Sequence, residues 1–182
     1  LQMHITRSMA KAVYSTKNIG HYGLAFDYYS HFTSPIRRYP DVLTHRLLMR
    51  VLENDYPREE ERPLYDRLCV QASNREKEAA DAERGSVKYK QVEYMSYRLG
   101  QQFDGVISGV SEWGLFVSEK KSKCEGMIRL RDLGNDFYVY DQKNSRVFGE
   151  RTGIEWKIGT PVKIKVKAAN LDLRVIDYEL VA

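Results

Sequence analysis

The sequence predicts an α+β fold in which a mainly helical first part is followed by a five-stranded OB-type β-barrel. In residues 41–52 and 64–95, apolar side chains recur at helical spacing with charged side chains between them. After Gly100 the pattern changes to short runs separated by glycines, which is typical of strands. Of the 182 residues, 42% are hydrophobic and 12% aromatic, which favours buried cores over disorder. We therefore expect two domains, residues 1–97 and residues 98–182.

The helical domain is expected to begin with a helix over residues 3–14. Gly20 and Gly23 then interrupt the pattern and predict a loop. Because the chain starts with Leu1 in what reads as the middle of that first helix, without a start methionine, we expect it to be a fragment of a longer protein.

Ser34 and Pro35 together predict the start of a helix. A serine hydroxyl can accept from a free backbone N–H at a helix start, and a proline at the first position has no N–H to leave unpaired. We expect a short turn over residues 34–39, a kink at Pro40, and a helix over residues 41–52. The face of that helix expected to be buried carries Leu43, Leu47 and Val51.

A polar loop over residues 53–63 precedes a long charged helix, expected over residues 64–95. Its apolar stripe is thin, which favours a solvated helix that packs along one side. The alternative is a helix that lies along the first domain and also leads into the second.

The second domain is expected to be the barrel, with a long insertion over residues 134–158 between its third and fourth strands. The five strands are expected at residues 103–109, 115–119, 125–128, 162–169 and 174–180. Such a barrel can bind single-stranded nucleic acid through aromatic and basic side chains on one face.

Composition excludes several classes of function. The net charge of +4 does not by itself indicate nucleic acid, so local placement of charge must carry that inference. Cys69 and Cys124 are far apart, which supports neither a zinc site nor a disulfide framework, and we expect a reducing cytoplasm. No apolar run approaches the roughly 20 residues that a membrane span needs, so we expect no membrane partner.

The stretch from His31 to Arg46 has the residues of an anion-binding site. Free N–H groups at a helix start attract anions, and the planar guanidinium groups of Arg37, Arg38 and Arg46 can grip phosphate oxygens two at a time. The stretch therefore predicts a phosphate-binding site.

Several motifs carry a family resemblance: Arg7-Ser8-Met9, Ala12-Val13-Tyr14-Ser15, His21-Tyr22-Gly23-Leu24-Ala25 and Ser34-Pro35-Ile36-Arg37-Arg38-Tyr39. Residues 7–48 resemble the C-terminal end of the RNB catalytic domain of the ribonuclease II family. Residues 98–182 resemble the S-one RNA-binding domain that follows it. The resemblance implies a processive 3′ to 5′ hydrolytic exoribonuclease that releases nucleoside monophosphates and uses magnesium held by clustered aspartates.

This chain has no such aspartate cluster. Asp27 and Asp41 are isolated acids, so we assign no metal ligand here and expect magnesium to be held by an upstream part of the same polypeptide. The implied partners are single-stranded RNA and that upstream part, and the implied parent enzyme is a monomer.

The resemblance also implies roles for residues of the arginine stretch. Arg37 takes the place of the family arginine that contacts the phosphate at the cleaved end of the RNA, and it is our candidate catalytic residue. Arg38 either touches backbone phosphate or pairs with Asp41. The other RNA-binding candidates are Ser34, Tyr39, which could instead pack in the core, His45, which could be a hydrogen-bonded structural residue, and Arg46, which could instead form an ion pair.

In the barrel, Trp113 and Phe116 occupy the two aromatic positions that S-one domains present to RNA, where they would stack unpaired bases unless they belong to the core. Arg129 stands where the family usually has histidine. Lys163, Lys165 and Lys167 alternate and so share one strand face, which is either an RNA track or a solvated surface.

The main hypothesis is the C-terminal part of an exoribonuclease. One alternative is a non-catalytic protein that binds single-stranded RNA through the arginine motif and the barrel. Another is a structural or protein-interaction module.

Overall fold

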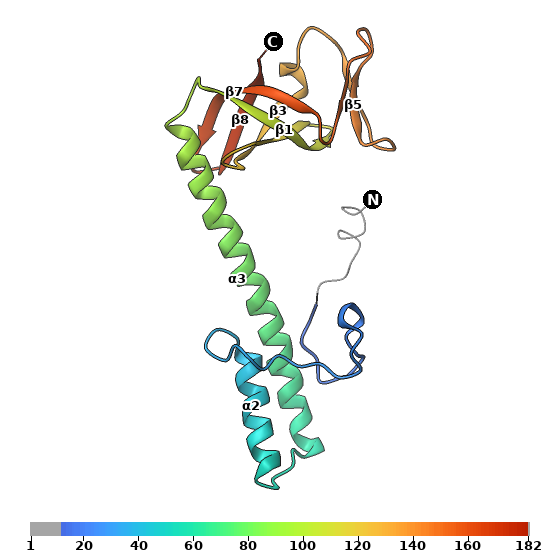
Figure 1. Ribbon diagram of the computed structural model, residues 1–182, viewed down its shortest axis with the longest axis vertical. Coiled ribbons are helices and arrows are strands. Elements are labelled where there is room, and N and C mark those ends of the chain that lie inside the picture. The colour runs from blue at the N-terminus through green and yellow to red at the C-terminus, as the bar shows by residue number, and fades with distance from the viewer. Residues whose placement is uncertain (1–11, 182) are drawn as a thin grey trace. The chain divides into compact units, whose positions relative to one another are not determined.

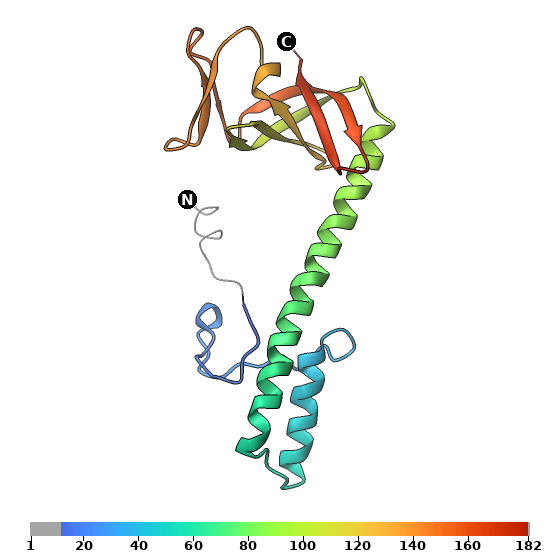
Figure 2. The same cartoon turned by 180° about the vertical axis from the view of Figure 1, so that it is seen from behind.

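The computed structural model describes residues 12–181 of the chain. The chain divides into two compact units, Leu1–Asp81 and Ala82–Ala182, which are treated separately below (Figures 1 and 2). The division falls inside the long helix α3 (Arg62–Ser96), whose end lies next to the boundary expected after residue 97. Most of the helix expected over residues 3–14 lies outside the described residues, and its last three positions are not helical.

The first unit contains the 3₁₀ turn η1 (Tyr22–Leu24), the helix α2 (Tyr39–Leu52), the turn η2 (Glu59–Glu61) and the first part of α3. Arg50, near the end of α2, connects α2 to η2 and α3 through its guanidinium. It donates to Asp55 at 2.7 Å, to Glu61 at 3.0 Å and to the hydroxyl of Tyr65 at 3.3 Å. This network fixes the loop between α2 and α3.

The turn expected over residues 34–39 precedes the helix as predicted. The helix start at Ser34 and Pro35 and the kink at Pro40 were wrong, and α2 begins at Tyr39 instead of residue 41. Ser34 and Pro35 belong to a turn before the helix, and Arg38 is the N-cap residue. Pro40 lies in the first turn of α2, where a proline has no hydrogen bond to break, and so it does not kink the helix.

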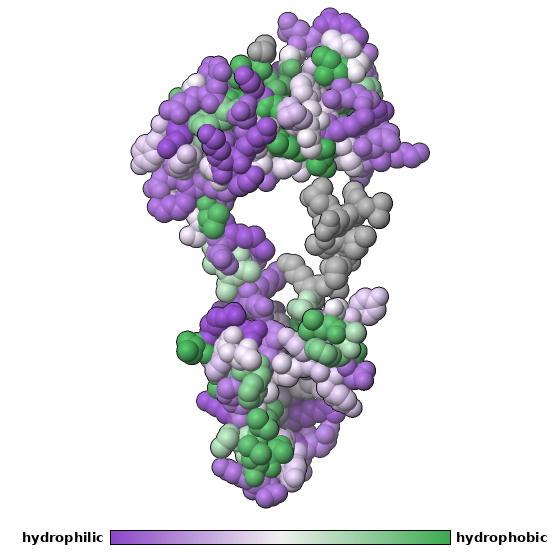
Figure 3. All heavy atoms as spheres, in the orientation of Figure 1, coloured by the Kyte–Doolittle hydropathy of each residue, from purple (hydrophilic) through white to green (hydrophobic). Residues whose placement is uncertain are grey.

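The first unit buries little apolar surface. Among residues 12–81 the structure buries no hydrophobic side chain, whereas the carboxylate of Asp41 is fully buried. Leu43 and Leu47 are half-buried and Val51 is exposed, so the predicted buried face of α2 is only partly covered. Figure 3 shows apolar side chains on the surface of this unit. Such a surface is typical of an interaction site.

The second unit is built on a closed barrel of five strands, which confirms the predicted fold class. These are β1 (Gln102–Ser111), β2 (Gly114–Glu119), β3 (Glu125–Arg129), β7 (Pro161–Asn170) and β8 (Val175–Leu180). Their order is β1-β2-β3-β8-β7; β3 pairs with β8 in parallel, and the other neighbouring pairs are antiparallel. The order and the one parallel pair are those of an OB fold.

Alternation along the strands fills the barrel. On β7 the side chains of Val162, Ile164 and Val166 are buried, and the intervening side chains face outward. The last turns of α3 add Val92 and Met95, both with no exposed surface, to the same core. The C-terminal end of α3 is therefore part of the barrel domain.

The insertion expected over residues 134–158 is an ordered sheet of its own. Its strands β4 (Tyr138–Asp141), β5 (Arg146–Gly149) and β6 (Glu155–Lys157) lie in that order and follow the 3₁₀ turn η3 (Leu130–Asp132). Val147 of β5 is fully buried in the barrel core cluster, so the sheet packs on the barrel.

No helix among residues 12–181 combines the length and the apolar character that a membrane crossing requires.

Candidate phosphate-binding site and nucleic-acid interface

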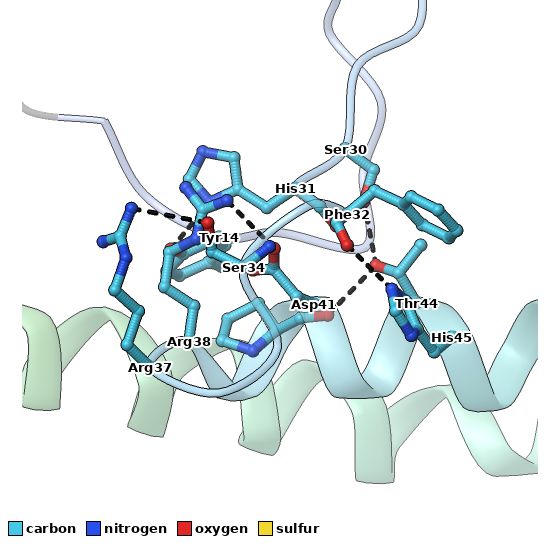
Figure 4. A network of polar contacts seen from close by, with 11 residues as sticks. Tyr14, Ser30, His31, Phe32, Ser34, Arg37, Arg38, Asp41, Thr44 and His45 are labelled. Atoms are coloured by element: carbon cyan, nitrogen blue, oxygen red, sulfur yellow. Dashed lines mark hydrogen bonds and ion pairs between the residues drawn. The ribbon is translucent and has the colours of Figure 1, made fainter.

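A tight turn before α2 presents the two adjacent arginines (Figure 4). The carbonyl of Ser34 accepts from the backbone N–H of Arg37 at 3.3 Å and of Arg38 at 3.0 Å. Pro35 fixes its own φ inside this turn, and the chain then enters α2 at Tyr39. The local sequence therefore forms a closed turn directly before a helix N-terminus.

The buried carboxylate of Asp41 lies under this turn. Its Oδ1 accepts from the backbone N–H of Ser34 at 2.7 Å and from the guanidinium of Arg38 at 2.9 Å. Burial by itself would raise the pKa of Asp41, but these two hydrogen bonds outweigh it and hold the pKa below its usual value. Asp41 is therefore a carboxylate at neutral pH.

The two arginines differ in what they contact. Arg38 forms the ion pair with Asp41, which was one of its two expected roles. Arg37 is exposed, and among residues 12–181 its guanidinium contacts only the hydroxyl of Ser34, at a long 3.4 Å. Within residues 12–181 no carboxylate pairs with Arg37 or with the exposed Arg46. Arg37 and Arg46 are thus the cations of this stretch that are free to meet a phosphate.

The segment before the turn is fastened along α2 by further hydrogen bonds. The hydroxyls of Ser30 and Thr44 lie 3.0 Å apart, and Nε2 of His45 lies 2.7 Å from the carbonyl oxygen of Phe32. His45 also packs its ring on that of Phe32, at 4.3 Å between centroids. His45 is therefore hydrogen-bonded within the protein, and its proposed RNA contact stays a prediction. Tyr39 is 48% exposed.

Sequence reasoning missed a tyrosine beside this site. The hydroxyl of Tyr14 lies 3.0 Å from Nδ1 of His31, and its backbone N–H donates to the hydroxyl of Ser73 on α3 at 2.9 Å. Burial, followed by a hydrogen bond with Glu76, raises the pKa of Tyr14 to about 12. Tyr14 thus links the loop that carries His31 to α3, a long-range contact for which the sequence gives no local signal.

The part of the chain that the structure describes does not fit a divalent metal. Within residues 12–181 no three side chains of histidine, cysteine, aspartate or glutamate gather closely enough to hold one. Asp41, next to the arginines, is instead committed to Ser34 and Arg38.

In the barrel, the aromatic candidates lie on the outside. Trp113 occupies the turn between β1 and β2 and is 70% exposed. Phe116 is half-buried and points outward, because its neighbours Leu115 and Val117 on β2 are buried. Phe116 also pairs across the strands with Met127 of β3. These two aromatic side chains therefore offer faces to a ligand on the outer surface.

A cation lies beside these rings. Arg129 is the register partner of Gly114, the residue after Trp113, and the backbone N–H of Leu130 donates to the carbonyl of Trp113 at 3.3 Å. The guanidinium of Arg129 is 45% exposed and lies 3.4 Å from the carboxylate of Asp177 on β8. Trp113, Phe116 and Arg129 thus belong to one outer region of the barrel.

The three lysines of β7 share an outer face as predicted, but most of them are paired. Lys165 lies 2.7 Å from Glu179, and Lys167 lies 2.9 Å from Asp132. Lys163 has no carboxylate partner within residues 12–181. Because exposed ion pairs are weak, a phosphate could still replace these partners.

Comparison with known proteins shows what this chain is similar to. Residues 1–54 match the family model of the RNB domain. Ribonuclease R 1 of Lactococcus lactis subsp. lactis is 40% identical over 98% of this chain and 22% of its own length. Ribonuclease R of Vibrio cholerae is 39% identical over the whole of this chain and 23% of its own length. This chain is similar to ribonuclease R over nearly its whole length. It spans about a quarter of the length of these relatives.

Solved structures show the same likeness. The apo form of Mycoplasma genitalium RNase R matches with a TM-score of 0.87 and 26% identity, covering 98% of this chain and 29% of that one. The same protein in complex with ribose methylated single-stranded RNA gives the same TM-score of 0.87. The helical part and the barrel thus both recur in a ribonuclease R.

Proposed function

We propose that this chain is part of a processive 3′ to 5′ exoribonuclease that hydrolyses RNA to nucleoside monophosphates. In this proposal Arg37 binds the phosphate at the cleaved end, and the barrel holds the incoming single strand. The observation that carries the proposal is the likeness to ribonuclease R over 98% of the chain, at 40% identity in one relative. The free, exposed guanidinium of Arg37 supports the assignment of its role.

Hydrolysis adds water across the bond between phosphorus and the 3′ oxygen, so the released nucleotide keeps its 5′ phosphate. Negative charge builds on the phosphate oxygens as water attacks. A guanidinium aimed at those oxygens stabilises that charge, and removing one such preorganised donor typically costs about 10²- to 10³-fold in rate. Arg46 adds positive potential near the same turn, and Ser34 and Tyr39 complete the expected contacts.

Magnesium is the metal we propose for the enzyme, where it would activate the attacking water. Since the described residues do not fit a metal, this proposal places its ligands elsewhere in the enzyme.

The barrel is proposed to guide single-stranded RNA. Trp113 and Phe116 would stack unpaired bases, while Arg129, Lys163 and Lys165 would meet the backbone. Their position on the outside of the barrel supports this use. The Mycoplasma genitalium relative was solved with single-stranded RNA bound.

We further propose that the exposed apolar surface of the first unit packs against an upstream part of the same polypeptide, in a monomeric enzyme. The cysteines Cys69 and Cys124 are both free, which supports a cytoplasmic location.

The proposal is tested with the protein encoded by the complete reading frame that contains this chain. With magnesium and a 5′-labelled single-stranded RNA, we expect stepwise release of nucleoside monophosphates. Arg37→Ala should lower kcat about 10²- to 10³-fold while RNA affinity changes less than about twofold, since the contact acts mainly in the transition state.

Arg75→Ala is the matched control, because Arg75 is also an exposed arginine, lies on α3 and pairs with Glu78. It should leave kcat unchanged. A wild-type protein that binds RNA without cleaving it would favour the alternative, a non-catalytic RNA-binding protein. Equal loss of turnover and of affinity in Arg37→Ala would contradict the catalytic role of Arg37.

A further inference from the structure

We propose that Asp41 is a positioning residue that holds Arg37 in place, and that Arg38 is committed to this hold instead of to RNA. The inference rests on the proposed role of Arg37. It assigns different roles to two adjacent arginines: Arg37 binds the RNA phosphate, and Arg38 binds Asp41.

Asp41 closes the arginine turn from below. A single carboxylate oxygen, Oδ1, accepts at 2.7 Å from the N–H of Ser34, where the turn begins, and at 2.9 Å from the guanidinium of Arg38, where it ends. The carbonyl of Ser34 closes the same turn from the other side through the N–H groups of Arg37 and Arg38. The backbone of Arg37 is thereby held between two fastened residues (Figure 4).

The ion pair between Arg38 and Asp41 is difficult to break because Asp41 is buried. The side chain of Asp41 is 0% exposed and that of Arg38 is 21% exposed. If Arg38 left to bind a phosphate, the carboxylate would remain buried with its charge unpaired, which is strongly unfavourable. Arg37 faces no such cost, because within residues 12–181 its guanidinium makes only the long contact to Ser34.

The consequence for the proposed reaction is geometric. A displacement of about 1 Å in a positioning group can cost about 10²-fold in rate. Releasing the turn would move the guanidinium of Arg37 relative to the phosphate without removing any contact to the rest of the RNA. Loss of Asp41 should therefore lower kcat and leave RNA affinity nearly unchanged.

A double-mutant cycle in the complete protein tests this inference. We expect Asp41→Ala to lower kcat about 10²-fold. The double variant Arg37→Ala, Asp41→Ala should be no slower than Arg37→Ala alone, because both changes remove the same interaction of Arg37 with the phosphate. A purely structural role of Asp41 would instead multiply the two losses, and that result would overturn the inference.

Asp41→Asn is the second variant, in case the alanine variant does not fold. Asparagine keeps the shape and the acceptor oxygen, and Oδ2 of Asp41 makes no hydrogen bond to any residue of 12–181 that would be lost. We expect about 10-fold lower kcat, again without further loss in the Arg37→Ala background. Asp55→Asn is the control, since Asp55 is an exposed acid that pairs with Arg50, and it should leave kcat unchanged.

The role of Arg38 is read from salt dependence. Arg38→Ala should lower kcat while the slope of log RNA affinity against log salt stays that of the wild type, whereas loss of a phosphate contact would reduce the slope by about 0.7. A reduced slope would overturn the assignment of Arg38. If Arg37→Ala itself kept full activity, the proposed function of Arg37 would fail and this inference with it.

Discussion

Asp177→Asn should increase the affinity of the barrel for single-stranded RNA. Asp177 lies 3.4 Å from the guanidinium of Arg129, and the two side chains are 24% and 45% exposed. In the proposed function a phosphate and this carboxylate compete for the same guanidinium. Removing the carboxylate charge therefore frees Arg129 for RNA.

The size of the effect follows from the exposure of the pair. An exposed ion pair contributes about 0.2 to 1 kcal/mol, so its loss should tighten RNA binding by up to roughly fivefold. One additional cation that meets a phosphate should also steepen the slope of log affinity against log salt by about 0.7. We expect both changes together.

Fluorescence anisotropy of a labelled single-stranded RNA, titrated with this chain over a series of salt concentrations, measures both quantities. Glu78→Gln is the matched control, because it removes the same charge from an exposed pair with Arg75 on α3. It should change neither affinity nor slope. An Asp177→Asn variant with unchanged or weaker affinity would refute the competition.

Two further predictions concern the second unit. Trp113→Ala should weaken RNA binding by about 1 to 3 kcal/mol, as expected for the loss of one stacked base, and the same titration measures it; unchanged affinity would place Trp113 outside the interface. The hydroxyl of Thr152, followed by the backbone N–H groups of Thr152, Arg151 and Phe137, lowers the pKa of Asp136 from 3.8 to about 2. The depressed pKa of Asp136 stabilises the insertion above about pH 4, and this stabilisation is lost as the pH falls through 2. Trp156 fluorescence should therefore show the insertion loosening in that range. Asp136→Asn should remove this pH dependence, and a transition that persists in the variant would contradict the cause.

The barrel was predictable because buried apolar and exposed side chains alternate along its strands in the sequence. Val162, Ile164 and Val166 occupy every second position of β7, and the observed strand extends one residue beyond the predicted range at each end. A side-chain period of two can belong only to a strand with one buried face, whatever lies around it.

The strands of the insertion could not be predicted from alternating side chains. Its strands have four, four and three residues, too short for a period to stand out. Arg146 and Asp141 join two of them across the sheet at 2.9 Å, a pairing that depends on the fold and leaves no local pattern. The sequence therefore located the segment but not its structure.

The arginine turn was located correctly, but the start of the helix that follows it was misread. Ser34-Pro35 has the residues of a helix start, yet Pro40, five positions later, also suits a first helical turn, and the structure uses the second proline. The i, i+3 spacing of Arg38 and Asp41 permits an ion pair without requiring it. The structure shows the ion pair with a buried Asp41, which supports the proposed role of Arg38 over a phosphate contact.

That burial is the feature of the first unit that asks for an explanation. Among residues 12–81, apolar side chains such as Ile19 and Ile36 remain exposed, while a carboxylate is fully buried. A buried ion pair contributes little net stability, so stability alone does not account for the burial of Asp41. Departures from such rules concentrate at functional sites. The cost of burying Asp41 is offset, in this interpretation, by a fixed turn that keeps Arg38 occupied and leaves Arg37 free.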